Sequence, residues 1–130
     1  MQGGGPVTLI ERKVISPSKR VFLIRLLSFQ NGWFISVSEG SDRIGSLHVS
    51  IASSNKVNTA RVIPSKYDSI FINTISETVT SRTNGISIVC VHSLEQLRLD
   101  DMKAIMGEIM NLAGRHDERN NQIQKEDLRQ

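Results

Sequence analysis

The residue types that most often carry out chemistry in proteins are sparse in this sequence. Its histidines are His48, His92 and His116, and Cys90 is its single cysteine. None of the histidines has a second ligand at a spacing that metal sites use, such as four residues further along a helix. Cys90 and His92 stand two residues apart, so a strand would present this thiol and this base on one face. A buried cysteine that serves only for packing is the simpler interpretation.

Three other segments match functional motifs only in part. Asp100–Asp101 could be a carboxylate pair, but it stands at a predicted helix start, where acids interact favourably with the helix dipole. Gly3–Gly5 has no preceding strand and no following Lys-Ser or Lys-Thr, so it is not a phosphate loop. Met102 and Met106 could form an adaptable binding surface, but they share an apolar helix face, where packing explains them better. The sequence therefore predicts no enzymatic activity and no catalytic, cofactor-binding or metal-binding residue.

Length and composition are those of one globular domain. The chain has 130 residues, of which 38% are hydrophobic and 22% charged. Lysine and arginine number 16 against 13 acids, but they are scattered, which is typical of solubility rather than of nucleic-acid binding. A single cysteine cannot form an internal disulfide, and no stretch reaches the roughly 18 apolar residues of a membrane span. We expect a soluble protein of the cytoplasm, with the nucleus left open as a second location, that binds neither nucleic acid nor membrane.

The spacing of apolar residues predicts the elements that position these side chains. Alternation and apolar runs predict strands, and helical spacing with capping residues predicts two helices. The strands are expected at 7–15, 20–29, 33–38, 44–51, 57–63 and 86–91, and the helices at 68–83 and 99–113, the second capped by Gly114. This order predicts an α+β fold, an antiparallel β-sheet or sandwich of about six strands flanked by two helices. Residues 1–6 are expected to be flexible, 7–114 to form the domain, and 115–130 to be a polar tail.

The segment LLSFQNGWFISVSEG, residues 26–40, raises the main question about function. Asn31–Gly32 between two apolar runs predicts a hairpin with a type I′ turn, which needs positive φ at both central residues. The run before the turn, residues 21–27, is apolar on both faces with one interruption at Arg25. A strand with one face in water should instead alternate apolar and polar residues. Surplus apolar surface of this kind, or an unprotected sheet edge, often marks a site for another protein.

The alternation in residues 44–51 is clearer. Leu47, Val49 and Ile51 alternate with polar residues, so this strand is expected to turn its apolar set inward. His48 is then expected on the solvent side.

Several strings in their order resemble the proteasome assembly chaperone 4 family. They are VFLIRLLSFQNGWFISVSEG, GSLHVSIAS, VNTARV and ISETVTSRTNGISIVCVHSL, and together they span roughly residues 20–113. The strongest points are Arg25-Leu26 ending an apolar strand, Trp33 opening the next, Ile51-Ala52-Ser53, and a helix running into Arg82-Thr83-Asn84. Ile63-Pro64 departs from the family, which tends to have a small residue and glycine there.

This resemblance implies a chaperone without enzymatic activity or cofactor. It would pair with a proteasome assembly chaperone 3-like protein, and the pair would hold an α-type subunit of the 20S proteasome, particularly α5, while the α-ring closes. The fold it implies is an antiparallel, sandwich-like β core flanked by helices.

One face or edge of the hairpin 20–38 is then expected to contact the partner chaperone. The candidate partner-binding residues are Arg20, Phe22, Ile24, Leu26 and Trp33, although their strands leave open which alternate set faces the core. Arg20, Arg25 and Arg43 could steer an acidic α-subunit surface, or be ordinary solvated arginines. Two other functions stay open, a general dimerisation or scaffold module and a small nucleic-acid-binding protein.

Overall fold

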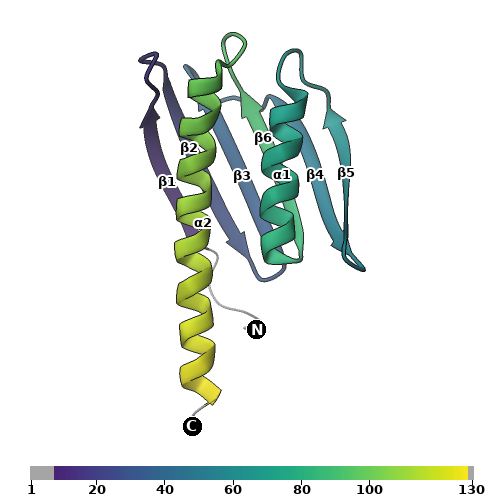
Figure 1. The fold of residues 1–130 in the computed structure, drawn as a ribbon. Helices are drawn as coiled ribbons and strands as arrows, with labels where there is room; N and C mark the ends of the chain where they lie inside the picture. The colour runs from purple at the N-terminus through teal and green to yellow at the C-terminus, as the bar shows by residue number, and fades with distance from the viewer. Residues whose placement is uncertain (1–7, 129–130) are drawn as a thin grey trace.

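The computed structural model describes residues 8–128, and the side chains of residues 8–114. Within residues 8–128 the chain forms one six-stranded sheet, in the order β1-β2-β3-β6-β4-β5, and two helices (Figure 1). The strands are β1 (Thr8–Ile15), β2 (Val21–Phe29), β3 (Gly32–Glu39), β4 (Ser46–Ser53), β5 (Lys56–Ile63) and β6 (Ile86–His92). The helices are α1 (Ser69–Thr83) and α2 (Leu99–Leu128). The predicted α+β class is confirmed.

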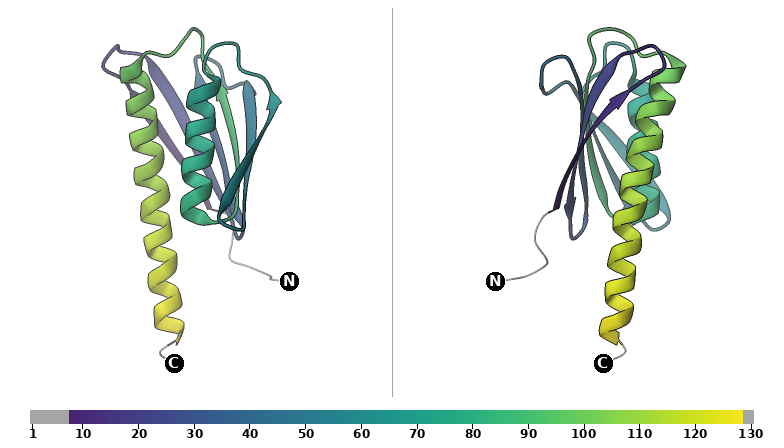
Figure 2. Two further views of the ribbon diagram at one scale, coloured as in Figure 1. Left: turned by 45° about the vertical axis from the view of Figure 1, so that its right-hand side comes forward. Right: turned by 90° about the vertical axis from the view of Figure 1, so that its left-hand side faces the viewer.

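Both helices lie on the same face of the sheet (Figures 1 and 2). The core fills the layer between them. Its fully buried side chains include Phe22, Ile24 and Leu26 of β2 and Ile105 and Ile109 of α2. The opposite face of the sheet is covered by no helix of residues 8–128, and we call it the helix-free face.

The sheet is mostly antiparallel, but β3 and β6 run parallel. After α1 the chain returns as β6 and enters the sheet between β3 and β4, where it is antiparallel to β4. A helical crossover of this kind makes a parallel neighbour possible, which a hairpin cannot do. The apolar run at 86–91 is thus a central strand, as its two apolar faces predict.

The hairpin between β2 and β3 forms where it is predicted, but its turn differs. Gln30 and Asn31 are the turn residues, and neither Asn31 nor Gly32 has a positive φ. Gly32 instead lets β6 approach, because a Cβ atom there would lie 1.8 Å from the carbonyl oxygen of Ile86. The two positive φ values that a type I′ turn needs occur at Ser54 and Asn55, between β4 and β5.

Helix α1 closely matches its predicted span of 68–83. Asp68 is its N-cap residue, and Asn84 caps its C-terminus in the left-handed conformation, with φ of 52°. Asn84 N–H donates to the carbonyl oxygen of Thr80 at 2.8 Å, which satisfies one of the free carbonyls at the helix end.

Helix α2 is longer than predicted. It continues through Gly114 to Leu128 and extends past the end of the sheet (Figure 1). At about 1.5 Å per residue a helix of 30 residues is about 45 Å long, whereas a strand of eight residues spans about 27 Å. The side chains of 115–130, the predicted polar tail, and residues 1–6, the predicted flexible N-terminus, lie outside the described residues.

A candidate protein-binding face of the sheet

Strand β4 turns its polar side chains toward the helices and its apolar side chains away from them. His48 and Ser50 are fully buried beneath α1. Leu47 and Val49 are half-buried on the helix-free face, and Ile51 is exposed there. The expectation that His48 faces solvent is therefore wrong.

Helix α1 explains this inversion, because it offers polar partners to the strand below. His48 Nδ1–H donates to Asn73 Oδ1 at 2.6 Å, and the hydroxyls of Ser50 and Ser76 share a hydrogen bond of 2.5 Å. Burial lowers the pKa of His48 despite the bond to Asn73, so the ring is neutral near pH 7. Buried polar groups with such partners are tolerated in a core. The apolar residues of β4 are left for the other face.

An apolar row crosses the helix-free face from one edge of the sheet to the other. Residues opposite each other on paired strands share a face, so the strand registers define the row directly. Its members, each paired with the next, are Leu9, Leu27, Phe34, Ile88, Val49 and Ala60. Phe29, Ile86 and Ile51 belong to the neighbouring row on the same face. Leu9 is 52% exposed, and Phe29 and Ile51 are similarly exposed.

On the same face, the row of residues that contains Glu11, Arg25 and Ser36 lies beside the apolar row and is more polar. Arg25 lies between Glu11, at 3.2 Å, and Asp42, with which it also forms an ion pair. The hydrogen bond from Arg25 holds the pKa of Asp42 below its usual value, so the carboxylate stays charged. These ion pairs make a polar border beside the apolar row, the arrangement found around the core of a protein interface. They also neutralise Arg25, which leaves less of its charge to steer a partner.

Most of the residues predicted to bind a partner lie on the face of the sheet that the helices cover. Phe22, Ile24 and Leu26 are fully buried under the helices, and Trp33 is nearly so. They belong to the core, so a partner could touch them only if the helices moved away.

Arg20 is also largely buried. It forms ion pairs with Glu39 at 2.6 Å and with Asp101 at 3.0 Å, and these bonds raise its pKa. They join the residue before β2 to β3 and to the start of α2, which indicates a structural role.

Sequence reasoning missed Leu9, Leu27, Phe34, Val49 and Ile88. It identified an apolar excess on both faces of 21–27 and of 86–91, but it did not find which alternate set is outward. A signal was present in 69–83, where Ser, Thr and Asn recur on the helix. A helix that places Ser and Thr among its buried residues suits a strand that turns His and Ser inward.

Cys90 shows no sign of reactivity. It is buried, and it accepts a hydrogen bond from Gly45 N–H at 3.3 Å. Burial raises the pKa of its thiol, so it is protonated near pH 7. This agrees with the packing role expected for it.

The described residues hold neither a metal-binding cluster nor a membrane-spanning helix. Among residues whose side chains are described, no three His, Cys, Asp or Glu gather where they could hold a metal ion. Neither helix of residues 8–128 is long and apolar enough to cross a membrane.

Comparison with solved structures gives a similarity of fold. No protein-family model matches the chain, and the comparison with curated proteins found no match. Among solved structures, the fold is similar to a chain in the crystal structure of a novel chaperone complex for yeast 20S proteasome assembly. The TM-score is 0.53, and the similarity covers 89% of this chain and 96% of that one. At 12% identity it concerns the fold alone.

Proposed function

We propose that this protein is a chaperone subunit without enzymatic activity that acts in assembly of the 20S proteasome by binding other proteins. The apolar row on the helix-free face is the observation that carries the proposal, because surface of this kind is typical of protein-binding sites. The fold similarity to a proteasome assembly chaperone chain supports the same conclusion. The sequence resemblance to the proteasome assembly chaperone 4 family agrees with it.

The helix-free face is the surface that we assign to a partner chaperone, a protein related to proteasome assembly chaperone 3. Five inter-strand spacings make the face about 24 Å wide, and strands of eight residues make it about 27 Å long. The resulting flat area of about 650 Å² is near the roughly 800 Å² per partner of a standard interface. A second sheet would fit such a surface, because sheets pack face to face through rows of apolar side chains.

The pair would then bind an α-type subunit, in particular α5, and promote closure of the α-ring. This part of the proposal comes from the family resemblance. Such a role needs no catalytic group, and we expect it in the cytoplasm, with the nucleus as a second location. A general dimerisation module would use the same face, but it would not bind α-subunits.

Affinity capture from cell extract, with bound chains identified by mass spectrometry, tests the proposal. The baits are the wild-type chain, Leu27→Asp and Phe34→Asp, which put a charge in the apolar row. Ile44→Asp is the matched control, because Ile44 is 80% exposed in the loop between β3 and β4. Circular dichroism checks that each bait is folded.

We expect the wild-type chain and Ile44→Asp to recover a second small chaperone together with 20S α-subunits and little mature β-subunit. Leu27→Asp and Phe34→Asp should lose the second chaperone, by at least about tenfold in recovery, because a buried unpaired charge is costly at an interface. Recovery of a partner without α-subunits would favour the general dimerisation module. Equal recovery by all four baits would overturn the assignment of the helix-free face.

A further inference from the structure

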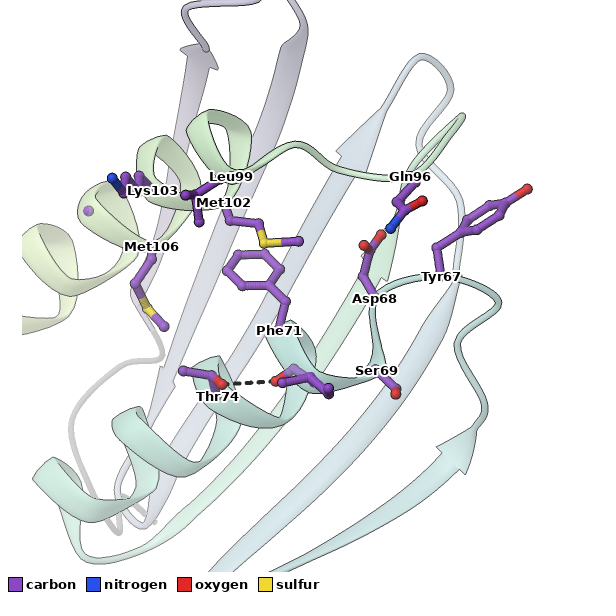
Figure 3. A pocket seen from close by; sticks show the side chains of 12 residues that line it. Tyr67, Asp68, Ser69, Phe71, Thr74, Gln96, Leu99, Met102, Lys103 and Met106 are labelled. Atoms are coloured by element: carbon purple, nitrogen blue, oxygen red, sulfur yellow. Dashed lines mark hydrogen bonds between the residues drawn. The ribbon is translucent and has the colours of Figure 1, made fainter.

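A second apolar surface lies on the opposite side of the molecule, in a groove between the first turns of α1 and α2 (Figure 3). The groove has a volume of about 610 Å³. Phe71 of α1 and Met102 of α2 line it between the helices, and Met106 lies one turn further along α2. This volume is in the range of pockets that hold a drug-sized ligand.

The two rims of the groove are unusually apolar for the outer surface of helices. Ile70 of α1 is 80% exposed, and Leu99 of α2 is 66% exposed. An amphipathic helix normally turns such side chains into the core and polar residues outward. Here both side chains line the groove, so an occupant of the groove would cover them.

Opposite charges stand toward the two ends of the groove. Asp68 precedes the first residue of α1, and Lys103 lies one turn into α2. Figure 3 shows them on either side of the pair Phe71 and Met102. Asp68 is only 5% exposed, and its Oδ1 has no hydrogen-bond partner among the described residues. A cation beside this carboxylate would act on it with little screening by water.

The directions of the helices select an orientation for an occupant. Helices α1 and α2 both begin at the same end of the sheet (Figure 1), and Asp68 directly precedes the first residue of α1. A helix lying between them would have the most favourable dipole interaction if it ran antiparallel to both. Its C-terminal end would then lie beside Asp68 and its N-terminal end beside Lys103. Basic residues at a helix C-terminus and acids at its N-terminus also suit the helix itself.

We propose that this groove binds an amphipathic helix of a partner protein, with an acidic residue in its first turn, an apolar face, and a Lys or Arg at its C-terminal end. The lining of α2 from Leu99 to Gly107 covers nine residues, or about 13 Å, which corresponds to two to three helical turns. Apolar residues of the bound helix at positions i, i+3 and i+7 would contact Phe71 and the two methionines. The groove and the helix-free face lie on opposite sides of the sheet, so both can be occupied together.

Selection from a display library of randomised helical 16-residue peptides tests the proposal on the full chain. Peptides are selected on the wild-type chain and compared with the double variant Ile70→Asp/Leu99→Asp. The double variant Ile44→Asp/Ile15→Asp is the matched control, because these residues are 80% and 67% exposed outside the groove. We expect enriched peptides to bind the wild-type chain and the control at least about tenfold more tightly than the groove variant.

The order of charges along the enriched peptides gives the second readout. Enriched peptides should carry an acid near the N-terminus and a base near the C-terminus. Lys103→Glu should weaken the binding of these peptides about tenfold. Replacing the peptide's acid with Lys should restore binding to that variant. Lys103 is exposed, so this substitution leaves the fold intact.

Three results would overturn the proposal: no enriched peptide, enriched peptides that bind the groove variant equally well, or binding that is insensitive to Lys103→Glu. A fourth such result would come from analytical sedimentation of the chain without any peptide. A dimer that Ile70→Asp/Leu99→Asp dissociates would mean that a second copy occupies the groove. None of these results bears on proteasome assembly, because the capture experiment tests the helix-free face with other variants.

Discussion

Asp101 joins the start of α2 to the sheet. Its carboxylate is fully buried and accepts hydrogen bonds from Ser18 Oγ at 2.6 Å, Arg20 Nη1 at 3.0 Å and Arg98 N–H at 2.8 Å. The last bond is half of a capping box, in which the third helical residue reaches back to the N-cap. Burial opposes the charge, but the nearby Ser16 and Ser18 hydroxyls and the Arg98 amide outweigh it and lower the pKa of Asp101 to about 2.

Replacing Asp101 with Ala should therefore lower the free energy of unfolding by about 3 kcal/mol, because it removes one of the two carboxylate partners of Arg20 and the capping acceptor of the Arg98 amide. Asp100→Ala is the control, since Asp100 is exposed in the same turn, and it should cost under about 0.5 kcal/mol. Urea denaturation at pH 7 measures both. The contribution of Asp101 is complete above its unfolded pKa of 3.8 and is lost as pH falls toward 2, so the two variants should converge in acid.

His48 makes the stability depend on pH in a higher range. Its pKa is lowered in the folded state, so below its unfolded value of 6.5 the unfolded chain binds a proton that the folded chain does not. The contribution of neutral His48 to the free energy of unfolding is thus complete above about pH 7, and it decreases toward pH 5. His48→Gln keeps a neutral amide beside Asn73 and should show a smaller decrease in the urea midpoint between these values. Equal decreases in the two proteins would mean that His48 is not the group that titrates.

Among the elements, the place of β6 depends on close backbone contact with the start of β3. The amide of Ile86 donates to the carbonyl oxygen of Asn31 at 2.9 Å, and Gly32 provides the space beside it.

Gly32→Ala should consequently cost about 3 kcal/mol, because its Cβ would overlap the Ile86 carbonyl and neither backbone can give way easily. Gly107→Ala in α2 is the control. No atom lies within 4 Å of a Cβ at that position, and alanine favours a helix, so a gain of about 0.5–1 kcal/mol is expected. Thermal unfolding of both variants measures the difference. A neutral Gly32→Ala would show that the contact between β3 and β6 is looser than this structure has it.

For the whole molecule, one face of β2 belongs to the core and the other to the helix-free face. Ile24 and Leu27 both belong to β2, but Ile24 is fully buried beneath the helices and Leu27 lies in the apolar row. Ile24→Asp should unfold the isolated chain, since an unpaired charge in the core costs more than about 4 kcal/mol. Leu27→Asp should stay folded and cost under about 1 kcal/mol. Circular dichroism and thermal unfolding separate the two outcomes, and an unfolded Leu27→Asp would make the helix-free face part of the core.

Local patterns were sufficient to predict most elements. The strands of 20–38, the helix that starts after Asp68 and ends at Asn84, and the apolar strand at 86–91 follow from periodicity and capping residues, which act within a few residues. The end of α2 was not predicted, because Gly114 lowers helix propensity without stopping a helix that is otherwise continuous.

The sequence by itself determined the element order, the α+β class and the presence of apolar residues on both faces of the central strands. Tertiary structure decided which face is which. In a strand a shift of one residue exchanges the two faces, so alternation alone cannot say whether Leu26 or Leu27 is inside. That choice came from what α1 and α2 bring to the sheet, including the Asn73 and Ser76 side chains that hold His48 and Ser50 inward. The apolar face left outside is therefore a property of the packed molecule rather than of any single segment.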